Sequence, residues 1–199
     1  MFKIPSLDKL VHELSRLPGV GPRSAQRLTH YLLKNPEFSR ELRSSLQMVE
    51  DNIKLCETCY NYTDNNDGLC FICKNPHRNH ELMCVVEQPE DILQIESSGA
   101  YQGLYHVLHG AISPLEGMTP DKLKIAPLME RLNHGSFQEI IMAVDSDLEG
   151  DTTVLYLHQQ LESLKIRVTR LAQGIPMGSD IDYIDDRTLH RALSHRTEV

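Results

Sequence analysis

The chain has 199 residues, a formal net charge of −8, 40% hydrophobic and 24% charged residues, values typical of a globular protein. It contains no stretch of about 18 apolar residues, which excludes a membrane-spanning helix, and its first residues lack the apolar run of a secretory signal. We therefore expect a cytoplasmic protein with no membrane partner. The charge is uneven, because residues 1–45 hold eight Lys and Arg residues against four acids. A basic end joined to an acidic body indicates two different partners, one of them polyanionic.

The amino-terminal quarter of the chain is predicted to be helical. Apolar residues recur at helical spacing over 6–15, which predicts a helix with Ser6 as its N-cap. A turn rich in Pro and Gly follows, and a second helix is expected to begin near Pro22 and to end before Pro36. The apolar pattern over 38–53 predicts a third helix.

Four of the five cysteines form two Cys-x-x-Cys pairs, separated by ten residues, in a polar segment. Two intervening residues let both thiolates of a pair reach one ion from a tight turn, and two pairs complete a closed tetrahedral zinc shell. A redox dithiol needs only one pair, so a structural zinc site is favoured. The predicted ligands are Cys56, Cys59, Cys70 and Cys73, with His77 and His80 as spare candidates and Cys84 as a core residue.

Beyond the cysteines, short apolar runs alternate with helical patterns. This alternation predicts a mostly parallel sheet with helices on both faces. We predict strands at 82–86, 105–108, 140–144 and 166–171, and helices at 89–97, 127–133 and 152–164.

The sequence Leu-Pro-Gly-Val-Gly at 17–21, between the first two helices, predicts a helix-hairpin-helix. Two glycines two residues apart let the backbone turn tightly, and the uncovered amides and the next helix N-terminus form a phosphate site. Two arginines four residues apart lie on one face of that helix and add phosphate contacts. A helical turn that merely needs glycine is the simpler alternative. The predicted DNA-binding residues, which contact backbone rather than bases, are Gly19, Val20, Gly21, Arg23 and Arg27.

Acidic residues follow two of the predicted strands. Glu87 ends the first strand, and Asp145 and Asp147 follow the strand at 140–144, with Glu149 just beyond. Ligands bind at the carboxyl ends of parallel strands, where these carboxylates could hold Mg²⁺ or a Glu could shuttle a proton. The alternative is that they are ordinary loop acids, or acids that precede a helix and offset its macrodipole.

Together these features resemble the RecR family along nearly the whole chain. The resemblance implies a multi-module α/β protein: a helix-hairpin-helix at 1–54, a four-cysteine zinc finger at 55–76, a Toprim domain at 79–174 and a C-terminal helical segment at 175–199 that takes part in oligomer contacts. It rests on residues 17–28, both cysteine pairs, 105–108, 113–117, 149–150 and 174–178.

The resemblance also implies a non-enzymatic role in recombinational DNA repair. It implies homo-oligomers, as dimers or tetrameric rings, that clamp DNA and act with RecO and RecF to load RecA on gapped DNA. Arg23 and Arg27 match positions where family members hold DNA. Glu149 and the neighbouring acids match a surface that contacts RecO.

The acids mark a departure from the family pattern. Family members usually carry an Asn-Pro-Thr-like stretch where this chain has Asp145-Ser146-Asp147. Catalytic Toprim enzymes bind magnesium through a Glu and an Asp-x-Asp pair, a set that Glu87, Asp145 and Asp147 match. A magnesium-dependent phosphotransfer enzyme, nuclease or primase-like, is therefore the alternative. A zinc protein that only bridges other proteins is a third hypothesis.

Overall fold

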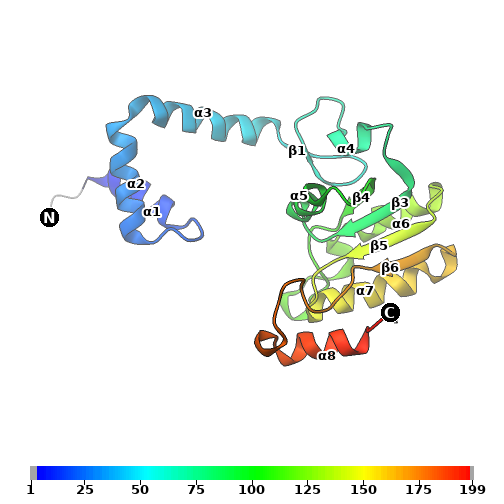
Figure 1. The fold of residues 1–199 in the computed structure, drawn as a ribbon. Helices are drawn as coiled ribbons and strands as arrows, with labels where there is room; N and C mark the ends of the chain where they lie inside the picture. The colour runs from blue at the N-terminus through cyan, green and yellow to red at the C-terminus, as the bar shows by residue number, and fades with distance from the viewer. Residues whose placement is uncertain (1–3, 198–199) are drawn as a thin grey trace. The chain divides into compact units, whose positions relative to one another are not determined.

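The structure is a computed structural model that describes residues 4–197. It divides into unit 1, residues 1–53, and unit 2, residues 54–199 (Figure 1). Residues 1–3, on which the expected absence of a secretory signal partly rests, lie outside the described residues. Residues 198–199, the end of the predicted C-terminal segment, also lie outside them. Within 4–197, no helix combines the length and the apolar character needed to cross a membrane.

Unit 1 consists of three helices. Each begins with proline at its first position, where the missing N–H costs no helical hydrogen bond. The N-cap of the first helix is Ile4, so the prediction of Ser6 is wrong: Pro5 starts the helix one residue earlier and places Ser6 inside the first turn. The helices are α1 (Pro5–Ser15), α2 (Pro22–Lys34) and α3 (Pro36–Asn52), and α1 packs against α2.

Unit 2 is built on a four-stranded sheet in which all neighbours are parallel, as predicted (Figure 1). The central strand pairs Met83 with Leu104 on one side and with Ile140 on the other. Its last residues are buried on both faces, which explains its continuous apolar sequence. The strands are β3 (Asn79–Val86), β4 (Gly103–Val107), β5 (Glu139–Ala143) and β6 (Arg167–Arg170), in the order β4-β3-β5-β6.

Alternate residues of β3 enter two separate cores, one on each face of the sheet. Met83 and Val85 pack with residues of the helices at 125–134 and 148–161, whereas Cys84 and Val86 pack with the helix at 89–98 and with residues 56–73, called the cysteine segment below. Helices on both faces confirm the predicted α/β class. The helices of unit 2 are α4 (Phe71–Lys74), α5 (Pro89–Ser98), α6 (Ile125–His134), α7 (Leu148–Leu161) and α8 (Asp186–Ser194), with short 3-10 turns at Pro114–Glu116, Pro120–Lys122, Glu162–Leu164 and Ile181–Tyr183.

Helix α7 begins four residues earlier than the sequence predicts. The Asp147 carboxylate accepts the Gly150 N–H at 2.8 Å and caps the helix. A side chain at Gly150 would place its Cβ 2.1 Å from the Asp145 carbonyl oxygen, so this turn requires glycine. As a correction, Glu149 and Asp151 lie within the first turn of α7 rather than before it.

Candidate functional sites

The four paired cysteines converge on one point. The Sγ atoms of Cys56, Cys59, Cys70 and Cys73 all lie within 4.8 Å of one another, an arrangement compatible with one tetrahedral zinc ion. A short antiparallel pair, β1 (Lys54–Leu55) with β2 (Tyr62–Thr63), presents the first two cysteines. Helix α4 begins after Cys70 and carries Cys73. Sequence spacing therefore predicted correctly which cysteines gather.

Backbone N–H groups favour the thiolate forms of two of the four cysteines, Cys56 and Cys70. The Cys70 N–H donates to the Cys56 Sγ at 3.3 Å, and the Cys73 N–H donates to the Cys70 Sγ at 3.4 Å. Hydrogen bonds with the Cys59, Cys70 and Cys73 side chains lower the pKa of Cys56, while hydrogen bonding with Cys56 raises the pKa of Cys59 and Cys73. Ionisation of one thiol therefore disfavours ionisation of its neighbours. A bound divalent cation would lower the pKa of all four thiols and allow them to be thiolates together.

The cysteine segment is attached to the sheet edge formed by β4. The Val107 N–H donates to the Cys59 carbonyl at 2.9 Å, and the His109 Nε2 lies 2.8 Å from the Tyr60 carbonyl oxygen. His77 and His80 are exposed, and neither joins the cysteine cluster that the described residues form. The four sulfurs therefore form the cluster without the proposed spare ligands.

The glycine hairpin of unit 1 leaves part of its backbone uncovered. Gly19 has φ +75°, which favours glycine, and Gly21 is the N-cap of α2. The Val20 N–H donates to the Leu17 carbonyl at 3.0 Å and is not available to phosphate. Pro22 has no N–H and the Ala25 N–H donates to the Gly21 carbonyl at 2.9 Å, so the first-turn N–H groups that remain available are those of Arg23 and Ser24.

Arg23 and Arg27 are both exposed on α2. Neither takes part in the ion pairs or side-chain hydrogen bonds found within residues 4–197. Two unpaired guanidinium groups next to a helix N-terminus form a surface suited to phosphate.

The acidic residues at the strand ends do not form a compact cage. Glu87 uses its Oε1 to accept the Asp145 N–H at 2.9 Å, and Asp147 is occupied in capping α7. Among the described residues, the sulfur atoms of the four paired cysteines lie within 4.8 Å of one another. The carboxylate oxygens of Glu87, Asp145 and Asp147 form no such group there. Burial raises the pKa of Glu87; the hydrogen bond from the Asp145 N–H opposes this, and the negative charges of Asp145 and Asp147 add to the increase.

Sequence reasoning missed an ion-pair network beside these acids. Burial opposes ionisation of Asp151, but Arg170 and Arg191 bind it and lower its pKa below the ordinary value. Arg170 also donates to the Asp145 carbonyl at 3.0 Å, and Arg187 of α8 donates to the Ser146 carbonyl at 3.1 Å. Helix α8 therefore contacts the loop at 145–147 and the start of α7 through residues that are far apart in the sequence.

A parallel sheet with helices on both faces, a four-cysteine cluster and a hairpin of two helices define a class of modular α/β protein with a metal-binding cluster. Family models agree with this class: the Toprim domain matches residues 81–172, "RecR, helix-hairpin-helix" matches 7–49, and "RecR, C-terminal" matches 174–197.

Curated relatives extend the match over full length. The recombination protein RecR of Bdellovibrio bacteriovorus is 52% identical, with all of both chains covered. Those of Geotalea uraniireducens and Desulforudis audaxviator are 47% and 46% identical, over 98% of this chain and 97% and 98% of theirs. The chain belongs to the RecR family of recombination proteins.

Proposed function

We propose that the protein is a non-enzymatic mediator of recombinational DNA repair that acts in the cytoplasm. It binds the DNA backbone without base specificity and holds a structural zinc ion at Cys56, Cys59, Cys70 and Cys73. The observation that carries this proposal is the exposed hairpin, where Gly19, Gly21 and the start of α2 lie next to the unpaired Arg23 and Arg27. Contacts of this kind hold phosphate and carry no sequence information.

The partners proposed are RecO and RecF, with which the protein would load RecA on gapped DNA. Membership of the RecR family supports this role. Asp145 and Asp147 are exposed and Glu149 lies nearby, so this acidic surface is open to a basic partner such as RecO. The same acids remain a candidate for Mg²⁺, but Asp147 and Glu87 already accept backbone N–H groups there.

DNA titration of the full chain tests the proposal. Two labelled duplexes of equal length and unrelated sequence are expected to bind with Kd values within about threefold, and log Kd should rise linearly with log salt concentration. Both DNAs should be recovered intact after incubation with Mg²⁺. A strong sequence preference would contradict the binding mode. Cleavage that is lost in Asp145→Asn would contradict the non-enzymatic assignment and favour the magnesium-dependent alternative.

We further propose that the chain assembles into a ring of identical subunits, as a dimer or tetramer. Among residues 4–53, only Ala25 and Thr29 are buried, so this part of unit 1 buries little of its own apolar surface. An apolar stripe on α3 is exposed, and contiguous exposed apolar residues are typical of a protein interface. It consists of Phe38, Leu42, Leu46 and Val49.

Native mass measurement tests this assembly. The full chain is expected to have a mass of two or four subunits, and Leu46→Glu with Val49→Glu should lower it by placing charges in the apolar stripe. Glu50→Ala, an exposed change on the same helix, is the control and should leave the mass unchanged. A wild-type monomer at all protein concentrations would contradict the ring.

A further inference from the structure

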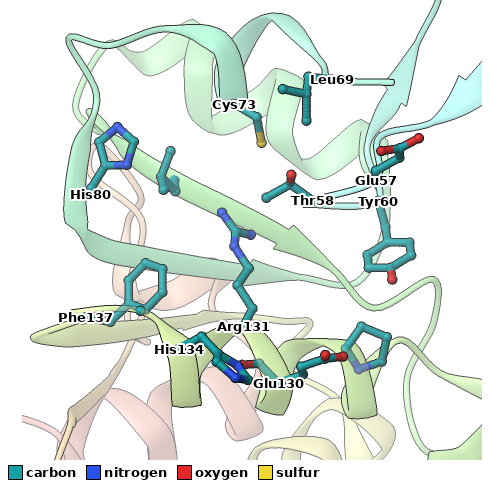
Figure 2. A pocket seen from close by; sticks show the side chains of 13 residues that line it. Glu57, Thr58, Tyr60, Leu69, Cys73, His80, Glu130, Arg131, His134 and Phe137 are labelled. Atoms are coloured by element: carbon teal, nitrogen blue, oxygen red, sulfur yellow. The ribbon is translucent and has the colours of Figure 1, made fainter. Parts of the chain in front are cut away.

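A cavity of about 520 Å³ lies in unit 2 between the cysteine segment and α6 (Figure 2). Cys73, one of the four clustered cysteines, is part of its lining, and the other roles discussed above do not use the cavity. The lining combines apolar and polar side chains, which can pack against a small ligand and fix its orientation. Leu69, Leu104, Pro127 and Phe137 are apolar, and the remaining side chains are mostly polar, among them that of Arg131.

The guanidinium of Arg131 stands in the middle of this cavity. Figure 2 shows it rising from α6 toward the cysteine segment, with Phe137 on one side and Thr58 on the other. Its Nη1 donates to the Tyr105 carbonyl at 2.6 Å, and its Cζ lies 5.8 Å from the centre of the Phe137 ring. These two contacts fix the plane of the guanidinium and leave its other N–H donors directed at the cavity.

Arg131 differs from the other partly buried arginines of unit 2. The side chains of Arg78, Arg170 and Arg191 are 5%, 24% and 21% exposed, and each forms an ion pair with a carboxylate. Arg131 is also partly buried, yet no carboxylate of residues 4–197 forms an ion pair with it. A cation withdrawn from water is normally paired, so a ligand that supplies the missing charge would be bound favourably.

We propose that this cavity binds an organic carboxylate on a short apolar stem. The carboxylate oxygens accept hydrogen bonds from the free guanidinium donors of Arg131, and the stem packs against Phe137 and Leu104. The lining also contains Glu57 and Glu130, which are exposed, whereas Arg131 is partly buried. Repulsion from these two carboxylates grows with the charge of the ligand, so it disfavours a polyanion such as DNA or a nucleoside phosphate more than a single carboxylate. The ligand class is therefore a singly charged acid, either free or at the C-terminus of a polypeptide.

Binding of N-acetyl-L-leucine to the full-length protein tests this site against a matched probe, N-acetyl-L-leucinamide, which lacks only the charge. The acid is expected to bind with a Kd of about 1 mM, typical of so small a ligand, and to shift the Arg131 Nε–H resonance in NMR spectra. The amide should bind at least about tenfold more weakly and leave that resonance in place. Equal binding of acid and amide, or no binding of the acid, would overturn the proposal.

Two variants separate binding from structure. Arg131→Gln keeps a donor for the Tyr105 carbonyl but removes the charge, and should weaken binding of the acid by about tenfold or more. Arg167→Gln is the control, because Arg167 is exposed on β6 and is not part of the cavity. Retained affinity in Arg131→Gln would overturn the proposal. If that variant does not fold, the wild-type resonance shift still decides between the acid and the amide.

A peptide probe distinguishes the two sources of the carboxylate. The tetrapeptide Ser-Gly-Ser-Leu with a free C-terminus should bind about tenfold more tightly than N-acetyl-L-leucine if the natural ligand is a polypeptide end. Similar affinities support a free small acid. Equal binding by the C-terminal amide of this peptide would count against either form of the carboxylate site.

Discussion

Replacing Arg23 and Arg27 together by alanine is expected to raise the Kd for duplex DNA by roughly 10- to 100-fold. Both side chains are exposed on the first two turns of α2, next to the N–H groups of Arg23 and Ser24. Each guanidinium that contacts phosphate releases counterions, so the slope of log Kd against log salt concentration should fall by about 2. Fluorescence anisotropy with a labelled duplex over a range of salt concentrations measures both quantities.

The control for this experiment lies on the same helix. Lys34→Ala removes a positive charge at the last residue of α2, far from the hairpin, and should change the Kd by less than about twofold. The double variant should unfold at the same temperature as the wild type, because neither arginine pairs with a described residue. Unchanged affinity of the double variant at the same salt concentration would rule out the hairpin as the DNA site.

Replacing Cys70 by alanine is expected to abolish binding of the proposed zinc ion and to destabilise unit 2. A structural zinc site contributes folding free energy directly, and the loss of one of four ligands removes several kcal/mol. The cysteine segment shares a core with Tyr105 and Val107 of β4, so the effect should reach the sheet. We expect about one zinc per wild-type chain, little zinc in the variant, and a thermal midpoint lowered by about 10 °C or more.

Cys84 provides the matched control. It is 2% exposed within β3, and burial raises the pKa of its thiol to about 12, as expected of a core residue. Cys84→Ala should keep its zinc and lose about 1–2 kcal/mol of stability through lost packing. Full zinc content in Cys70→Ala, or loss of zinc in Cys84→Ala, would show that the metal site has been assigned to the wrong sulfurs.

Local patterns in the sequence were sufficient for much of the fold. The alternation of apolar runs and helices predicted the parallel sheet, and the cysteine spacing predicted the cluster of sulfurs. The start of α7 was predicted too late, because Gly150 has a low helix propensity while its close approach to Asp145 is visible only in three dimensions. The two-residue strands β1 and β2 are too short to produce a periodic signal.

The sites missed by the sequence analysis depend on contacts between distant residues. Asp151 meets Arg170 and Arg191, which lie 19 and 40 residues away along the chain, and Arg131 meets the carbonyl of Tyr105 26 residues before it. No local motif marks such pairs. The importance of Arg131 emerges only when its neighbours are known, because a single arginine in an amphipathic helix is indistinguishable from a solvated one.

The attachment of the cysteine segment to β4 also bears on aggregation. Strand β4 is at the edge of its sheet, where open N–H and C=O groups can recruit a strand from another molecule. Cys59 occupies the Val107 N–H and Arg131 occupies the Tyr105 carbonyl, which blocks this edge. Without the proposed zinc ion, the Cys59 carbonyl would no longer be held against the Val107 N–H, so zinc-depleted protein is expected to be more prone to intermolecular β-pairing. The proposed ion would then protect against misassembly as well as against unfolding.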